Sequence, residues 1–231
     1  MRALRILLIT AVVLGGLFIA ADRLALNYAE GEVAGKIQAQ RGVGGGSADV
    51  SIKGFPFLTQ VLGKELDEVD VTLNGVEAQA GGRTLHIARM TAALHDVRLG
   101  SNFSTATAAT ATGTARVSYA ELAKASGEDV TVGYGGNGKV KVTGSVQVPV
   151  LGSVTRSVLS TVSIADGDTI RVRADEVPGE GIPGVEERVR ERTDFDRSVA
   201  GLPAGLKLQK VEATAEGVVI TLTGTNVVLA G

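Results

Sequence analysis

The stretch KVKVTGSVQVPV, residues 139–150, alternates apolar and polar side chains over nearly its whole length. Its valines all fall on even positions, whereas lysine, threonine, serine and glutamine fall on odd ones. This period of two predicts a β-strand with one apolar face directed into the core. Shorter runs of the same kind centre on Val71, Ile170 and Ile220, and they predict three further strands.

Turn signals and changes of phase extend this pattern along the chain. The glycine-rich GYGGNG at 133–138 and DGD at 166–168 predict hairpin turns. Two strands move their apolar residues from odd to even positions, or the reverse, and each change predicts a β-bulge, one near 88–89 and one near 108–109. Long strands with bulges predict a strongly curved antiparallel sheet.

Composition agrees with a strand-rich fold and excludes several functions. The chain is 44% hydrophobic but only 3% aromatic, and valine, threonine, alanine and glycine dominate. It contains no cysteine, which excludes disulfides and thiolate metal sites. The net charge of −2 is the opposite of that expected for a nucleic-acid binder or a polybasic membrane reader. We therefore expect no nucleic-acid partner.

Residues 1–22 have the form of a secretory signal or of a single membrane anchor. Arg2 and Arg5 precede an apolar run over 6–21. Cleavage after Ala21 would place Ile19 where a small residue is preferred, so the pattern favours an uncleaved anchor. In either case residues 23–231 are exported as one domain, held at the outer face of the plasma membrane or secreted.

Three helices are predicted beside the strands. Apolar residues at helical spacing over 22–40 predict a helix that continues from the apolar run. Ser118 and Glu121 have the spacing of a capping box, which predicts a short helix to about Lys124. Residues 184–200 predict a further helix, whose charges of alternating sign indicate a solvated face.

A search for catalytic groups finds no convincing set. His86 and His95 lack the cysteines or clustered carboxylates that usually complete a metal site. The sequence has no G-x-S-x-G nucleophile elbow, and its glycine-rich runs lack the lysine and serine of a phosphate-binding loop. We expect a protein that is not an enzyme and that has no cofactor and no metal.

The segment GFPFLTQVLGKEL, residues 54–66, interrupts the strands and holds two of the five phenylalanines. Two interpretations remain open. It is either a crossover packed into the core or an apolar lid over a ligand site.

Several stretches, taken in order, resemble the LmeA-type phospholipid-binding proteins of actinobacterial cell envelopes. They are the N-terminal apolar segment with its following helix, GFPFLTQVLGKELDEVDVTLNGV at 54–76, YAELAKASG at 119–127 and GLPAGLKLQKVEATAEGVVITLTGTNVVL at 201–229. The resemblance implies an α+β fold of the tubular lipid-binding (TULIP, BPI-like) type. In that fold a long N-terminal helix packs on a highly curved, bulged antiparallel sheet and encloses an elongated apolar groove.

The resemblance also implies a function at the cell envelope. We expect an extracytoplasmic phospholipid-binding protein that transfers or presents lipid, of phosphatidylinositol type, in the assembly of a lipomannan-type glycolipid. One alternative is a non-catalytic scaffold for an envelope glycan-assembly enzyme such as a glycosyltransferase; a less favoured one is an envelope hydrolase or transferase. The residues expected to bind lipid are Leu26, Val33, Ile37, Phe55, Phe57, Leu58, Leu62, Val140, Val142, Val146 and Val148.

Overall fold

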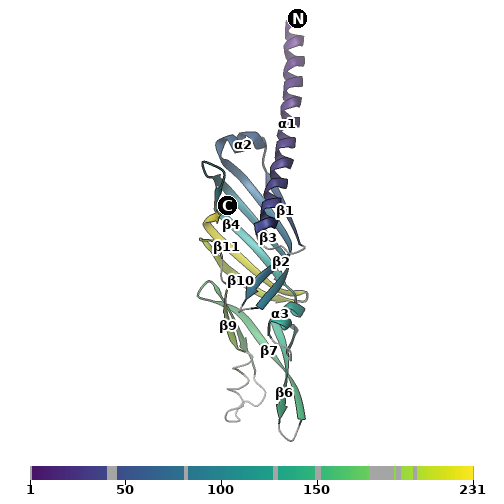
Figure 1. The fold of residues 1–231 in the computed structure, drawn as a ribbon, viewed down its shortest axis with the longest axis vertical. Coiled ribbons are helices and arrows are strands. Elements are labelled where there is room, and N and C mark those ends of the chain that lie inside the picture. The colour runs from purple at the N-terminus through teal and green to yellow at the C-terminus, as the bar shows by residue number, and fades with distance from the viewer. Residues whose placement is uncertain are drawn as a thin grey trace.

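The chain folds into an elongated α+β structure with two antiparallel sheets (Figure 1). The structure, a computed structural model, describes residues 2–40, 46–80, 83–126, 130–148, 152–176, 190, 194–199 and 202–230. The N-terminal helix projects from one end of the molecule, the larger sheet lies in the middle, and the smaller sheet forms the other end.

The larger sheet has six strands in the order β1-β2-β3-β4-β11-β10. Their bounds are β1 Ser47–Lys53, β2 Glu65–Ala80, β3 Arg83–Leu99, β4 Thr105–Val117, β10 Leu206–Thr214 and β11 Gly217–Ala230. The last strand of the chain therefore lies beside β4, and it joins two distant parts of the sequence in one sheet.

The smaller sheet has five strands in the order β5-β6-β7-β8-β9. Their bounds are β5 Val130–Gly136, β6 Lys139–Val148, β7 Gly152–Ala165, β8 Thr169–Ala174 and β9 Phe195–Ser198. The strand predicted over 139–150 is confirmed over 139–148, and residues 149–150 lie outside the described part. The two hairpin turns are confirmed, at 137–138 and 166–168. The helix predicted over 184–200 is wrong at 195–198, because that segment pairs with β8 at the edge of the sheet. Residues 184–189, 191–193 and 200 lie outside the described part.

Helix α1 runs without a break from Arg2 to Gln40, which confirms the predicted continuation of the apolar segment. Its C-terminal half packs on the larger sheet. Leu26 is buried there, and the Glu30 carboxylate accepts a hydrogen bond of 2.8 Å from the Ile52 N–H. Val33 is 39% exposed and does not pack on the sheet, whereas its neighbour Ala34 packs against the core.

Helix α2, Phe57–Gly63, connects β1 to β2. It is held against α1 by Asp22, a fully buried residue whose Oδ1 accepts a hydrogen bond of 2.8 Å from the Leu58 N–H. Arg23 donates to the other oxygen of the same carboxylate, also at 2.8 Å. One side chain thus fixes where α2 sits along α1.

Helix α3, Tyr119–Ser126, begins as predicted but ends two residues beyond Lys124. The Ser118 hydroxyl accepts a hydrogen bond from the Glu121 N–H at 3.3 Å, which is one half of a capping box. The Glu121 carboxylate instead accepts from the N–H of His86 on β3, and Tyr119 donates to the carbonyl of Thr214 at 2.6 Å. These bonds hold α3 against the larger sheet.

Four neighbouring strands change face together in one row of the larger sheet. The row consists of Asp67, Asp96, Ala109 and Asn226, which fall opposite one another in registers that stay unbroken on either side. Asp96 and Asn226 have positive φ angles of 49° and 50°. Buried residues lie three positions apart across the row, for example Leu94 and Val97 on β3. Each strand therefore contains one extra residue, and the apolar face continues without interruption.

The change of face predicted near 108–109 coincides with this row, but the predicted one-strand bulges are wrong. Neither β3 nor β4 shifts register with its neighbours, because the partner strand gains a residue at the same level. Near 88–89 the matching residue on β2 is Gly75, whose φ of 66° suits glycine. Register shifts occur instead between Leu208 and Lys210 and between Tyr134 and Gly136.

Candidate functional site

Three adjacent rows of residues cross all six strands of the larger sheet on one face and contain only apolar residues or glycine. We call this surface the apolar inner face. From β1 to β10, the α2-side row is Ile52, Val69, Leu94, Ala111, Gly224 and Leu206; the middle row is Val50, Val71, Ala92, Gly113, Leu222 and Leu208; the α3-side row is Ala48, Leu73, Met90, Ala115, Ile220 and Val211.

Two hydrophobic cores cover parts of the apolar inner face. At the α2 side, Leu26 of α1 and Phe57 of α2 are buried against it. At the α3 side, Val140 of the smaller sheet and Leu122 of α3 pack with Ile220 of β11. The helices and the smaller sheet thus enclose the same face of the larger sheet from its two ends.

Between these cores a group of residues on β2, β3 and β4 remains half-buried. We call it the open strip; its members are Val71, Leu73, Met90, Ala92 and Gly113, of which Val71 also packs against the core at the α2 side. Ala92 and Gly113 are small, so the middle of the strip carries little side-chain volume. A β-carbon added to Gly113 would lie 3.2 Å from the carbonyl oxygen of Thr91 and 3.9 Å from Leu222. The first of these contacts is tight, so a side chain is sterically disfavoured at Gly113 and the middle of the strip stays flat.

The opposite face of the same strands is polar. The hydroxyls of Thr91 and Thr114 lie 2.7 Å apart on it. His95 lies beside Glu68 of the neighbouring strand, with its Nδ1 3.7 Å from the carboxylate. His86 lies beside Glu77, with 3.1 Å between its Nε2 and Oε1. Within the described ranges no group of three or more histidine, aspartate or glutamate residues could hold a metal ion.

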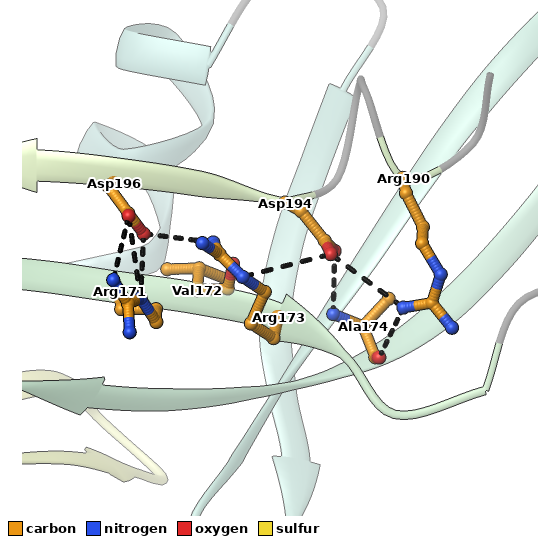
Figure 2. Close-up of polar contacts among 7 residues, drawn as sticks. All are labelled: Arg171, Val172, Arg173, Ala174, Arg190, Asp194 and Asp196. Atoms are coloured by element: carbon orange, nitrogen blue, oxygen red, sulfur yellow. Dashed lines mark hydrogen bonds and ion pairs between the residues drawn. The ribbon is translucent and has the colours of Figure 1, made fainter. Parts of the chain in front are cut away.

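Charged groups in the smaller sheet form a closed set of contacts rather than an open anion site (Figure 2). Arg171 donates from Nε and Nη2 to the two oxygens of Asp196, each at 3.1 Å. The Arg173 guanidinium lies 2.9 Å from the same carboxylate, and the N–H of Ala174 donates to Asp194 at 2.8 Å. The hydrogen bond from Arg171 lowers the pKa of Asp196 below its ordinary value. This cluster connects β9 to β8.

One buried polar atom lies apart from these networks. Ser160 of β7 is fully buried, and its hydroxyl has no hydrogen-bond partner among the residues that the structure describes. It pairs with Val140 on one side and Ala174 on the other, so it belongs to the packed part of the smaller sheet and not to the open strip.

The structure does not gather the sequence-predicted lipid-binding residues into one site. Leu26, Ile37 and Phe57 belong to the core at the α2 side, and Val140 and Val142 to the core at the α3 side. Leu58 is half-buried, whereas Val33, Phe55 and Leu62 are exposed. Val146 and Val148 lie on β6, but their side chains fall outside the described part.

Sequence reasoning placed most of the open strip on strands but did not assign it to the site. The alternation around Val71 and Leu73, and the even positions of Met90 and Ala92, were the available signal. What was missing is the register, which sets these residues side by side between the two cores.

A long helix packed on a large antiparallel sheet with an apolar inner face is the arrangement of the tubular lipid-binding proteins. A family model agrees with that class: the chain matches the LmeA-like phospholipid-binding family over residues 20–223 and belongs to it. No curated protein and no solved structure matches the chain. The described residues also contain one helix, within α1, that is long and apolar enough to cross a membrane, a property shared by membrane anchors and signal sequences.

Proposed function

We propose that the chain is an extracytoplasmic phospholipid-binding protein that holds an acyl chain of its lipid along the open strip. The observation that carries this proposal is the half-buried apolar strip between two packed cores, in a chain of a phospholipid-binding family. Ala92 and Gly113 leave room at its centre. A lipid would cover apolar surface that the protein's own side chains leave partly in contact with water.

The energetics favour a role in moving or presenting lipid. Exposing an acyl chain to water costs about 0.8 kcal/mol for each methylene. β2, with 16 residues, is about 50 Å long at ~3.3 Å per residue, which exceeds the ~30 Å hydrocarbon core of a bilayer. The open strip lies in the middle of that length, so it would shield the part of the chain that crosses β2, β3 and β4 and lower the barrier to leaving the membrane.

We propose further that residues 6–21 are retained as an anchor and that residues 23–231 act as one lipid-binding domain. The unbroken helix α1 supports this arrangement, because it passes from the apolar segment directly into the core. The resemblance to LmeA-type proteins supports a phosphatidylinositol-type lipid, a role in lipomannan-type glycolipid assembly and an envelope glycosyltransferase as partner. The protein itself is proposed to be non-catalytic.

Native mass spectrometry tests the binding function. A chain shortened to residues 22–231 keeps the buried Asp22 and is purified without detergent, after which the bound material is extracted with organic solvent. We expect a discrete mass increment that extracts as phospholipid, with its head group identified by fragmentation. A protein that stays free of lipid after incubation with envelope phospholipids would contradict the proposal.

A further inference from the structure

Large apolar side chains are exposed at the end of the molecule where α1 leaves the sheet. Phe55, just before α2, is 58% exposed; Leu62 at the end of α2 is 83% exposed; and Phe103 in the β3–β4 loop is 57% exposed. Figure 1 shows α2 beside α1, at the end of the larger sheet from which the helix projects. We call these three residues the docking edge.

Basic groups accompany the two phenylalanines. The Arg23 guanidinium carbon lies 5.1 Å from the centre of the Phe55 ring, and the Lys64 ammonium lies 6.0 Å from that of Phe103. Aromatic rings with nearby basic groups and a protruding leucine are typical of segments that lie in the membrane–water interface. The chemistry of the docking edge therefore fits a phospholipid surface.

The position of the docking edge along α1 is fixed by hydrogen bonds. Asp22 follows the apolar run directly and binds the backbone of Leu58, so α2 is held at the level where the run ends. The β3–β4 loop is held to the end of α2 through Lys64. The backbone carbonyl of Lys64 accepts a hydrogen bond from the Leu99 N–H at 2.9 Å, and its Nζ donates to the Ser101 carbonyl at 3.4 Å.

This level corresponds to the head-group layer of a membrane. One helical residue advances about 1.5 Å, so Arg23 lies about 3 Å beyond Ala21, the last residue of the apolar run. The head-group layer on each side of a bilayer is about 5–7 Å thick. Phe55, which contacts Arg23, falls inside that layer when the outer end of the apolar run lies at the hydrocarbon boundary.

We propose that the docking edge inserts into the surface of the membrane that α1 enters. It thereby holds the larger sheet at the membrane from which the protein takes up its phospholipid. The proposal rests on the retained anchor of the proposed function. Its occupant is a phospholipid surface. The experiment must distinguish this membrane contact from binding of a partner protein at the docking edge.

Site-directed labelling of the full-length chain in vesicles of phosphatidylcholine and phosphatidylglycerol tests the insertion. Because the chain has no cysteine, Leu62→Cys gives a single site for an environment-sensitive fluorophore. The matched control is Ala215→Cys in the exposed β10–β11 turn. This turn lies at the other end of β11, about 40 Å along the strand at ~3.3 Å per residue.

We expect blue-shifted emission from the Leu62→Cys label, with quenching by a lipid that carries its quencher near the head group, and neither effect at Ala215→Cys. Identical emission from the two labels would overturn the proposal. A blue shift without quenching by lipid would also overturn it, since it indicates a protein contact. If the label inserts while no lipid co-purifies with the protein, the proposed function is contradicted and membrane docking is supported. If lipid co-purifies while the label does not insert, only the docking proposal is contradicted.

A second measurement uses Phe103→Asp, at an exposed position of the docking edge that can change without loss of core packing. We expect slower uptake of labelled phospholipid from vesicles with an unchanged final amount bound. An unchanged rate of uptake would overturn the proposal.

Discussion

Substitution of Ala92 by phenylalanine fills the centre of the open strip. Ala92 is half-buried on β3, and its neighbours across the strands are Val71 and Gly113. Gly113 has no side chain, so the new ring can extend toward it, where the Leu222 side chain is the nearest neighbour. The change therefore affects the space proposed for the lipid more than the packing of the protein.

The expected loss of affinity follows from the area that the ring takes. A phenyl ring covers about one strand spacing, ~4.8 Å, and so excludes about three methylenes of an acyl chain from the strip. At about 0.8 kcal/mol per methylene, this amounts to about 2.4 kcal/mol. Binding of a phospholipid should weaken about 50-fold, since each 1.4 kcal/mol is about a factor of ten.

Titration with a fluorescent phospholipid measures this change, and Ala93→Phe is the matched control. Ala93 is the next residue on the same strand, but it lies on the polar face, opposite Asp70 and Thr112. The Ala93→Phe variant should therefore bind phospholipid with the affinity of the unaltered chain. Both variants should keep the far-UV circular dichroism and melting temperature of the parent. Equal affinity of Ala92→Phe and Ala93→Phe would refute the assignment of the acyl chain to the open strip.

Three further predictions concern stability. Phe57→Ala should lower the free energy of unfolding by about 3–5 kcal/mol in denaturant titration, whereas Phe55→Ala should change it little, since only Phe57 is in the core. Asp22→Ala should lower the melting temperature by removing the acceptor that holds α2, and Asp22→Asn, which keeps an acceptor, should lower it less. The hydrogen bond from Thr161 lowers the pKa of Asp175, so its stabilisation is complete above the ordinary value of 3.8 and is lost as the pH falls through the folded-state pKa. In a plot of melting temperature against pH, Asp175→Asn should reduce the fall in melting temperature at acid pH.

Much of the fold could be predicted because alternation is a local property. Residues 139–150 showed the period of two clearly, and β6 occupies 139–148 of that range. The placement of β11 between β4 and β10 could not be predicted in the same way, since it joins segments about a hundred residues apart. Pairing over such separations depends on the complementarity of whole faces, which no short window contains.

The site was harder to predict because exposure depends on what covers each face. Phe55 and Phe57 look equivalent in the sequence, yet the chain enters α2 between them, and one points to solvent while the other enters the core. The helical spacing at Val33 fits an inward position, but the helix is turned so that Ala34 packs against the core and Val33 is exposed. The open strip became recognisable only when both of its flanking cores were in place.

The row in which four strands change face constrains how this sheet can vary in length. Loss of Asp96 alone would reverse inside and outside for half of β3, while its neighbours kept their orientation. Loss of all four residues together, Asp67, Asp96, Ala109 and Asn226, would preserve every remaining cross-strand pair and leave the four strands alternating without interruption at this level. Insertions and deletions at this level are therefore tolerated only as a matched set, so single-residue gaps here should be absent from related sequences that keep the fold.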